Sequence, residues 1–103
     1  MYLDSSVDFF LNTCTTYSES SKRPIYLPST SDLPEGAIVT IRGVRGAWGD
    51  VMPRNASTEK ISVSDDNTAT VIPMQSADRF DFVLCKHGFS YNTWLCNAYD
   101  RDV

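Results

Sequence analysis

Residues 25–41 read IYLPSTSDLPEGAIVTI and hold two segments of alternating apolar and polar side chains, separated by a turn. In the first segment Ile25 and Leu27 project to one side and Tyr26 to the other, which is the period of a β-strand. The same alternation runs through residues 37–42. The stretch therefore predicts two short strands, at 25–27 and 37–42.

Proline and glycine define the break between these strands. Pro28 has no N–H to donate to a ladder, so the first strand ends there or lies at a sheet edge. Pro34 sets φ at the second position of a reverse turn, and Gly36 accepts a positive φ without a Cβ clash. The turn residues and the alternation thus predict the same break.

Alternation elsewhere predicts further strands at 60–63, 69–72, 79–85 and 93–99. Residues 60–63 and 69–72 flank a polar turn and are expected to pair as a hairpin, and the last two strands to form a second hairpin. Side chains that share a face of the second hairpin are Phe80, Phe82 and Leu84 on one strand, and Trp94, Cys96 and Ala98 on the other.

The intervening residues complete the expected fold. Residues 43–50 contain three glycines and favour a loop, and residues 51–54 are expected to add a short edge piece. Short strands with a turn at each break predict an all-β domain, a small antiparallel sandwich or barrel-like domain. A chain of 103 residues corresponds to one such domain.

The first 24 residues differ from the rest, so we divide the chain into an N-terminal arm and linker, 1–24, and a β domain, 25–103. Residues 7–17 fit both a helical and an extended period, and their threonines favour the extended form. The segment can add a strand to a neighbouring molecule's sheet, or it can pair as the first strand of its own domain. The apolar side chains expected to make the contact are Val7, Phe9, Phe10 and Leu11.

The charge balance limits the partners that the chain can have. The formal net charge is −4, which argues against binding to nucleic acid or to an anionic membrane surface. No apolar run approaches the length of a membrane span, and the N-terminus lacks the basic region of a signal peptide. We therefore expect a protein that is made and kept in the cytosol or assembled there.

No motif predicts a metal site or an enzyme. Cys85, His87 and Cys96 lack the paired spacing of a zinc site, so the cysteines Cys14, Cys85 and Cys96 are expected to be free thiols. A disulfide between Cys85 and Cys96 is the minor alternative. No nucleophile motif surrounds a cysteine, and the loop at 43–46 lacks the Lys-Ser/Thr of a phosphate-binding loop. We expect no catalysis and no cofactor.

Four ordered pieces of sequence resemble a known module. They are IxLP at 25–28, LPxGxxVxI at 33–41, the pair Val71-Ile72, and FxFVLCxxGxxxxxW at 80–94. This order resembles a small β module of bacteriophage virion proteins, found in capsid decoration proteins, head fibres and tail fibre tips. The chain departs from it in two places, since residues 73–78 contain no glycine and the last turn is longer.

The resemblance implies a homotrimer that binds and stabilises a phage shell as a capsid decoration, or cement, protein. Its partners would be itself and the major capsid protein or other virion proteins, and its location the virion, assembled in the host cytoplasm. The N-terminal residues Val7, Phe9, Phe10 and Leu11 would attach to the shell. The core or the trimer interface would contain Phe80, Phe82, Leu84 and Trp94.

Two other functions fit the same residues. A fibre tip would bind a cell-surface glycan or protein, with Trp48, Phe89 and Tyr91 as exposed contacts. A small phage-encoded inhibitor would block a host protein with an acidic, aromatic surface. A trimer in solution favours the virion functions, whereas a monomer favours the inhibitor.

Overall fold

The computed structural model describes residues 1–64, 67–75, 78–86 and 92–99. The described residues form strands and one short 3₁₀ helix, η1. The elements are β1 (Phe9–Asn12), β2 (Arg23–Tyr26), η1 (Thr30–Asp32), β3 (Ile38–Gly43), β4 (Gly49–Met52), β5 (Lys60–Ser64), β6 (Asn67–Ala69), β7 (Ile72–Met74), β8 (Arg79–Cys85) and β9 (Thr93–Tyr99). The prediction of an all-β chain is confirmed.

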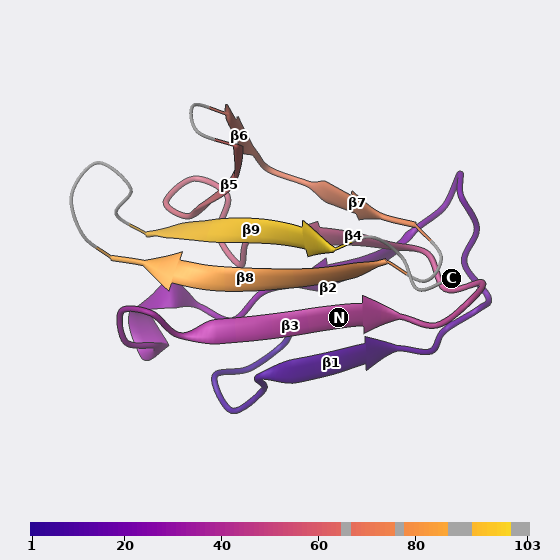
Figure 1. Ribbon diagram of the computed structural model, residues 1–103, viewed down its shortest axis with the longest axis horizontal. Coiled ribbons are helices and arrows are strands. Elements are labelled where there is room, and N and C mark those ends of the chain that lie inside the picture. The colour runs from indigo at the N-terminus through magenta and orange to yellow at the C-terminus, as the bar shows by residue number, and fades with distance from the viewer. Residues whose placement is uncertain (65–66, 76–77, 87–91, 100–103) are drawn as a thin grey trace.

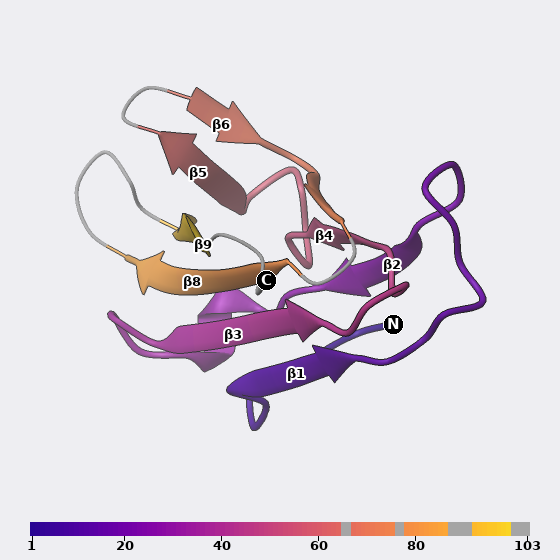
Figure 2. The ribbon, with the colours of Figure 1, turned by 45° about the vertical axis from the view of Figure 1, so that its right-hand side comes forward.

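The strands form two sheets. One has six strands in the order β1-β3-β8-β9-β5-β6, and the other has three in the order β2-β4-β7. Figure 1 shows the larger sheet towards the viewer with β2 and β4 behind it, and Figure 2 shows the same two layers from another side. None of the helices in the described part of the chain is long and apolar enough to cross a membrane.

The core lies between the two sheets and follows the predicted alternation. Ile25 and Leu27 are buried whereas Tyr26 is half-buried, and Val39 and Ile41 are buried whereas Thr40 is half-buried. The inward-facing residues of the last hairpin are also buried within this single chain. They are Phe80, Phe82, Leu84 and Trp94.

The turn lies one residue later than predicted, because the Ala37 N–H donates to the Pro34 carbonyl at 3.2 Å and Pro34 is therefore its first residue. The positive φ predicted for Gly36 is confirmed, at +81°, the left-handed conformation that its lack of a Cβ permits. Its N–H donates to the Leu84 carbonyl at 2.8 Å, which joins the turn to the end of β8. Strand β2 ends at Tyr26, before Pro28, and lies at an edge of the smaller sheet, as a strand followed by proline should.

The sheets are mixed, which corrects the expectation of a wholly antiparallel sandwich. β1 pairs with β3, β2 with β4, and β5 with β9, all in parallel. The chain crosses to the other sheet after β1, β2, β3 and β4, so alternate strands return to the same sheet running in the same direction. Turn residues mark where a strand ends, but they do not say which sheet the next strand joins.

The same crossings explain two further differences between the predicted and the observed strands. The predicted strand at 69–72 is divided, because β6 ends at Ala69 in the larger sheet and β7 begins at Ile72 in the smaller one. Strand β4 is the centre of its sheet and not an edge piece. Pro53 lies just beyond the end of β4, so it removes no hydrogen bond from either ladder.

A buried carboxylate joins the crossovers at one end of the sandwich. Glu59 is only 4% exposed, and its Oε2 accepts hydrogen bonds from the N–H and the hydroxyl of Thr30, both at 2.8 Å. Its Oε1 accepts a bond from the Asn55 N–H at 2.9 Å. Glu59 thereby ties the β2–β3 crossover to the β4–β5 crossover.

We expect Glu59→Ala to lower the free energy of unfolding by about 2–4 kcal/mol, because two buried donors of Thr30 and the N–H of Asn55 lose their acceptor. Chemical denaturation measures this loss. Glu19→Ala, at an exposed position, is the matched control and should change stability by less than about 0.5 kcal/mol. Equal stability of the two variants would contradict the structural role of Glu59.

Candidate functional site

The N-terminal segment forms the first strand of the domain in this structure. β1 pairs in parallel with β3, with Phe9 beside Thr40 and Leu11 beside Arg42. The structure thus matches the second alternative, pairing within the chain. The role of residues 7–11 in binding a shell stays a prediction.

Only two of the four predicted contact residues face outward. Phe9 is 53% exposed and Leu11 is 42% exposed. Val7 and Phe10 are half-buried and pack against the core. A contact made by the folded chain would therefore use Phe9 and Leu11.

A buried amide anchors the end of β1 to the smaller sheet. The Asn12 side chain is fully buried, and its Oδ1 accepts a hydrogen bond from Arg23 Nη1 at 3.1 Å. Its Nδ2 lies 3.4 Å from the Trp48 carbonyl, to which it donates. The Arg23 guanidinium also lies 5.5 Å from the centre of the Phe10 ring. These contacts fix the segment to the body of the domain.

The outer edge of β1 is open. Thr40 N–H donates to the Asp8 carbonyl and Val44 N–H to the Asn12 carbonyl, so residues 8, 10 and 12 of the segment direct their backbone groups at β3. By the alternation of a strand, the N–H and C=O groups of Phe9 and Leu11 then point away from the sheet. Figures 1 and 2 show no strand beyond β1 on that side. Such an edge can accept an extended segment from another chain.

Apolar side chains from three neighbouring strands form a row on the face of the larger sheet that points away from the core. Ile38, Val83 and Leu95 lie side by side in register across β3, β8 and β9. Ile38 is 54% exposed and Leu95 is 39% exposed. With Phe9 and Leu11 on β1, these residues make up what we call the apolar band.

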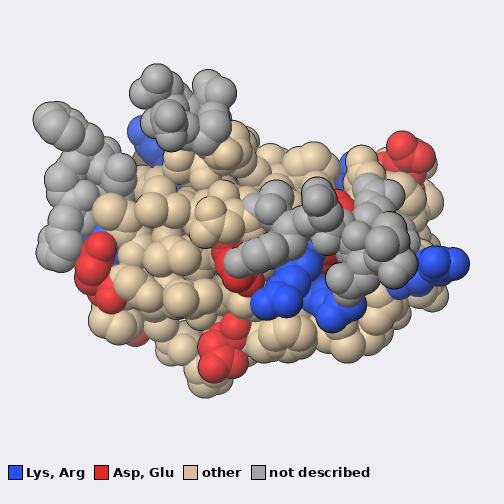
Figure 3. Space-filling model, in the orientation of Figure 1, with Lys and Arg blue, Asp and Glu red and all other residues tan. Residues whose placement is uncertain are grey.

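The charged groups next to the band are largely paired with neighbours. The Thr40 hydroxyl donates to Asp81 Oδ1 at 2.7 Å, and Arg79 Nε lies 3.9 Å from the same carboxylate oxygen. Figure 3 shows a broad uncharged area over one half of β3, β8 and β9, with most of the Lys and Arg side chains gathered toward the other half.

The contact residues predicted from the sequence did not include Ile38, Val83 or Leu95. The available signal was the pairs Val83-Leu84 and Trp94-Leu95, in which neighbouring residues of one strand are both apolar. Because neighbours in a strand point to opposite faces, such pairs place apolar side chains on the outside as well as in the core. That signal locates the band without a structure.

The structure describes only part of the predicted aromatic contact surface. Trp48 is half-buried, and its carbonyl accepts hydrogen bonds from Asn12 and from the Arg23 N–H. Phe89 and Tyr91 lie outside the described residues. Trp94 Nε1 is buried and has no hydrogen-bond partner in the described part of the chain. The fibre-tip contact at these residues stays a prediction.

The three cysteines are free and half-buried. Cys85 is in register with Thr93 and Cys96 with Phe82, so they lie on opposite faces of the β8–β9 pair. Burial, together with the charge of Asp81, raises the pKa of Cys96 to about 11. A hydrogen bond with Thr16 lowers the pKa of Cys14. Among the described residues, no three His, Cys, Asp or Glu side chains gather to hold a metal ion.

No family model matches the chain, and neither curated proteins nor solved structures provide a match. The likeness to phage virion proteins therefore rests on the four sequence pieces alone.

Proline substitutions test which backbone groups of β1 face outward. Leu11→Pro removes an N–H that the sheet does not use, so its unfolding free energy should lie within about 0.5 kcal/mol of that of Leu11→Ala. Phe10→Pro removes an N–H bonded to β3 and should be less stable than Phe10→Ala by more than about 1 kcal/mol. Chemical denaturation of the four variants measures both differences. A larger loss of stability from proline at residue 11 than at residue 10 would contradict the assignment of the outward backbone groups to Leu11.

The two perturbed thiols should react at different rates. At pH 8, about one Cys96 thiol in a thousand is ionised when its pKa is about 11, whereas the lowered pKa of Cys14 favours its thiolate. We therefore expect iodoacetamide to modify Cys14 much faster than Cys96, measured by peptide mapping over time. The Cys96 rate should rise about tenfold for each unit of pH up to its pKa. Equal modification rates of Cys14 and Cys96 at pH 8 would contradict the opposite shifts of their two pKa values.

Proposed function

We propose that the protein is a virion structural protein, a capsid decoration protein that binds and stabilises a phage shell as a homotrimer. The observation that carries the proposal is the apolar band on the outer face of the larger sheet. Exposed apolar side chains that gather on one face of a protein mark candidate sites of protein association. Binding would remove the band from water, which favours association.

The position of β1 supports the same function. Phe9 and Leu11 add apolar side chains to one end of the band, and their backbone groups point outward beside it. A partner at the outer edge of β1 can therefore add a strand there, through backbone hydrogen bonds, while neighbouring copies of the chain cover the band. In this proposal the major capsid protein supplies that strand.

The trimer is proposed from the sequence resemblance, because relatives of the module are homotrimers. In an assembly of copies, the core of each subunit would contain the residues that the single chain already buries. They are Phe80, Phe82, Leu84 and Trp94. The contact between subunits would then use the band. This division gives the subunit core and the subunit interface separate residues that can be changed one at a time.

Light scattering on the purified chain tests self-association. We expect a mass three times that of the 11.5 kDa chain. Leu95→Lys places a charge in the band and should shift the mass toward that of a monomer, because burying an unpaired charge is costly. Val71→Lys is the matched control, since Val71 and Leu95 are both 39% exposed and Val71 lies outside the band. It should leave the mass unchanged.

A monomeric wild-type chain would overturn the trimer and favour the inhibitor. A trimer that Leu95→Lys and Val71→Lys leave equally intact would overturn the use of the band as the subunit interface. A trimer lost only in Leu95→Lys supports both parts of the proposal.

A further inference from the structure

Three planar side chains stack on the surface beside the smaller sheet. The rings of Tyr2 and Tyr26 are 4.5 Å apart and inclined by 14°. The Arg54 guanidinium carbon lies 4.4 Å from the centre of the Tyr2 ring. Because Tyr26 covers one face of that ring, Arg54 must lie over the other. This contact with the ring limits where the guanidinium can lie.

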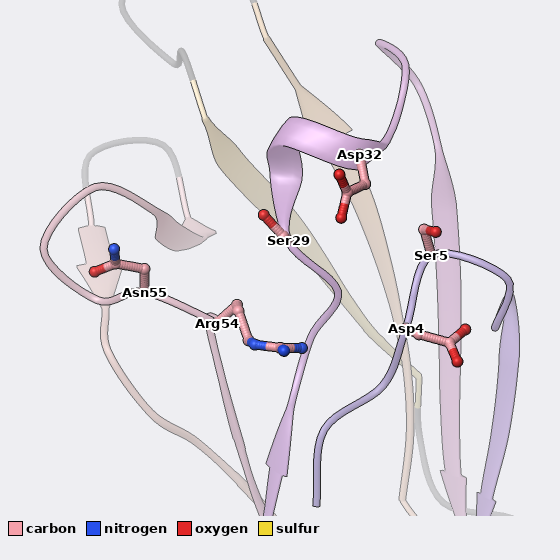
Figure 4. A pocket seen from close by; sticks show the side chains of 6 residues that line it. All are labelled: Asp4, Ser5, Ser29, Asp32, Arg54 and Asn55. Carbon is pink, nitrogen blue, oxygen red and sulfur yellow. The ribbon is translucent and has the colours of Figure 1, made fainter.

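Arg54 lies at the wall of an open depression of about 500 Å³. Polar residues from three separate segments line it: Asp4 and Ser5 near the N-terminus, Ser29 and Asp32 around η1, and Arg54 and Asn55 after β4. Figure 4 shows Arg54 extending from one side toward the space between the segments and the Asp32 carboxylate pointing into it. The Asn55 amide and the Asp4 carboxylate point away from Arg54 in the same view.

The walls of the depression are held in place by Glu59. The buried carboxylate accepts two hydrogen bonds from Thr30, which is the first residue of η1, and one from the N–H of Asn55. The same three bonds that join the crossovers therefore fix the segments that carry Asp32 and Arg54. A site whose polar groups are positioned before binding loses less entropy when a ligand arrives.

The two inward groups have complementary hydrogen-bonding capacity that the protein itself does not use. Within the described chain, the Arg54 guanidinium has no hydrogen bond or ion pair, and neither has the Asp32 carboxylate. The guanidinium supplies donors only, and the carboxylate supplies acceptors only. The Asp4 carboxylate also lines the depression, but it points away from Arg54 and accepts hydrogen bonds from Ser6. The two charges that face the space have opposite signs, so an anion would be repelled by Asp32 and a cation by Arg54.

We propose that this depression binds a carbohydrate. A sugar hydroxyl both accepts and donates, so neighbouring hydroxyls of one neutral ring can accept from Arg54 and donate to Asp32 together. The Ser29 hydroxyl, which also lines the depression, can either donate or accept a hydrogen bond. The contacts suit recognition of a single ring, and the expected dissociation constant is in the millimolar range.

The inference is independent of the proposed assembly. Tyr26 lies on β2, in the smaller sheet, and its side chain points away from the core, whereas the apolar band lies on the outside of the larger sheet. The band and the depression share no residue. A decoration protein and a monomeric inhibitor would both retain the sugar site.

The test is a titration followed by nuclear magnetic resonance of the ¹⁵N-labelled full chain. The probes are glucose, galactose and N-acetylglucosamine, with inorganic phosphate and tetramethylammonium as charged comparisons. We expect at least one sugar to shift the Arg54 Nε–H and the amides of Ser29 and Asp32 in a saturable manner. Neither charged probe should do so.

Two variants locate the binding. Arg54→Met keeps an unbranched stem against Tyr2 but loses every donor, and it should weaken sugar binding at least tenfold. Arg45→Met changes an exposed arginine outside the depression and should leave the affinity unchanged. The spectra show at the same time that each variant is folded. Absence of any sugar-dependent shift, saturation by a charged probe alone, or equal loss in both variants would overturn the proposal.

Discussion

The Glu59 carboxylate is the interaction on which the arrangement of the loops depends. It is nearly excluded from water and accepts three hydrogen bonds, from the N–H and hydroxyl of Thr30 and the N–H of Asn55. The Thr30 hydroxyl oxygen also lies 3.2 Å from Asn92 Oδ1, and the Asn92 carbonyl accepts from the Lys60 N–H. One buried group thus connects two crossovers between the sheets and the starts of β5 and β9. Removing it would leave the two buried donors of Thr30 without this acceptor.

The crossovers in turn determine which surfaces face outward. Because the chain changes sheet between most early strands, β1 returns beside β3 in parallel and becomes the edge of the larger sheet. Its inward residues join the core, and Phe9 and Leu11 are left outside with Ile38, Val83 and Leu95. At the end of the sandwich, the crossovers bring Asp32 and Arg54 to one depression. The two candidate surfaces are therefore separate consequences of one topology.

Local pattern predicted the strands well but not their partners. Alternation at residues 25–27, 37–42 and 79–85 and the turn at Gly36 follow from side-chain direction and backbone sterics, which act over a few residues. Which sheet a strand joins depends on distant contacts, so the parallel pairs, the central place of β4 and the division of 69–72 were missed. Hydrophobicity alone did not predict that Glu59 would be buried.

The candidate site was predictable only in part. Phe9 and Leu11 were identified as contact residues because their segment is apolar, but the inward direction of Val7 and Phe10 depends on the pairing with β3. Ile38, Val83 and Leu95 come together only through the strand register. The depression beside Arg54 joins three segments that are far apart in sequence, so no local pattern points to it.

Hydroxyl-radical footprinting with mass spectrometry would test most directly whether the apolar band is the assembly surface. The account predicts that oxidation of Phe9, Leu11, Ile38 and Leu95 falls several-fold as the protein concentration is raised through the range of association. Tyr2, which is 61% exposed and lies outside the band, should be oxidised equally at every concentration. If oxidation of the band residues stays constant, like that of Tyr2, while the mass of the particle increases, the protein associates through another surface. The central claim would then be wrong.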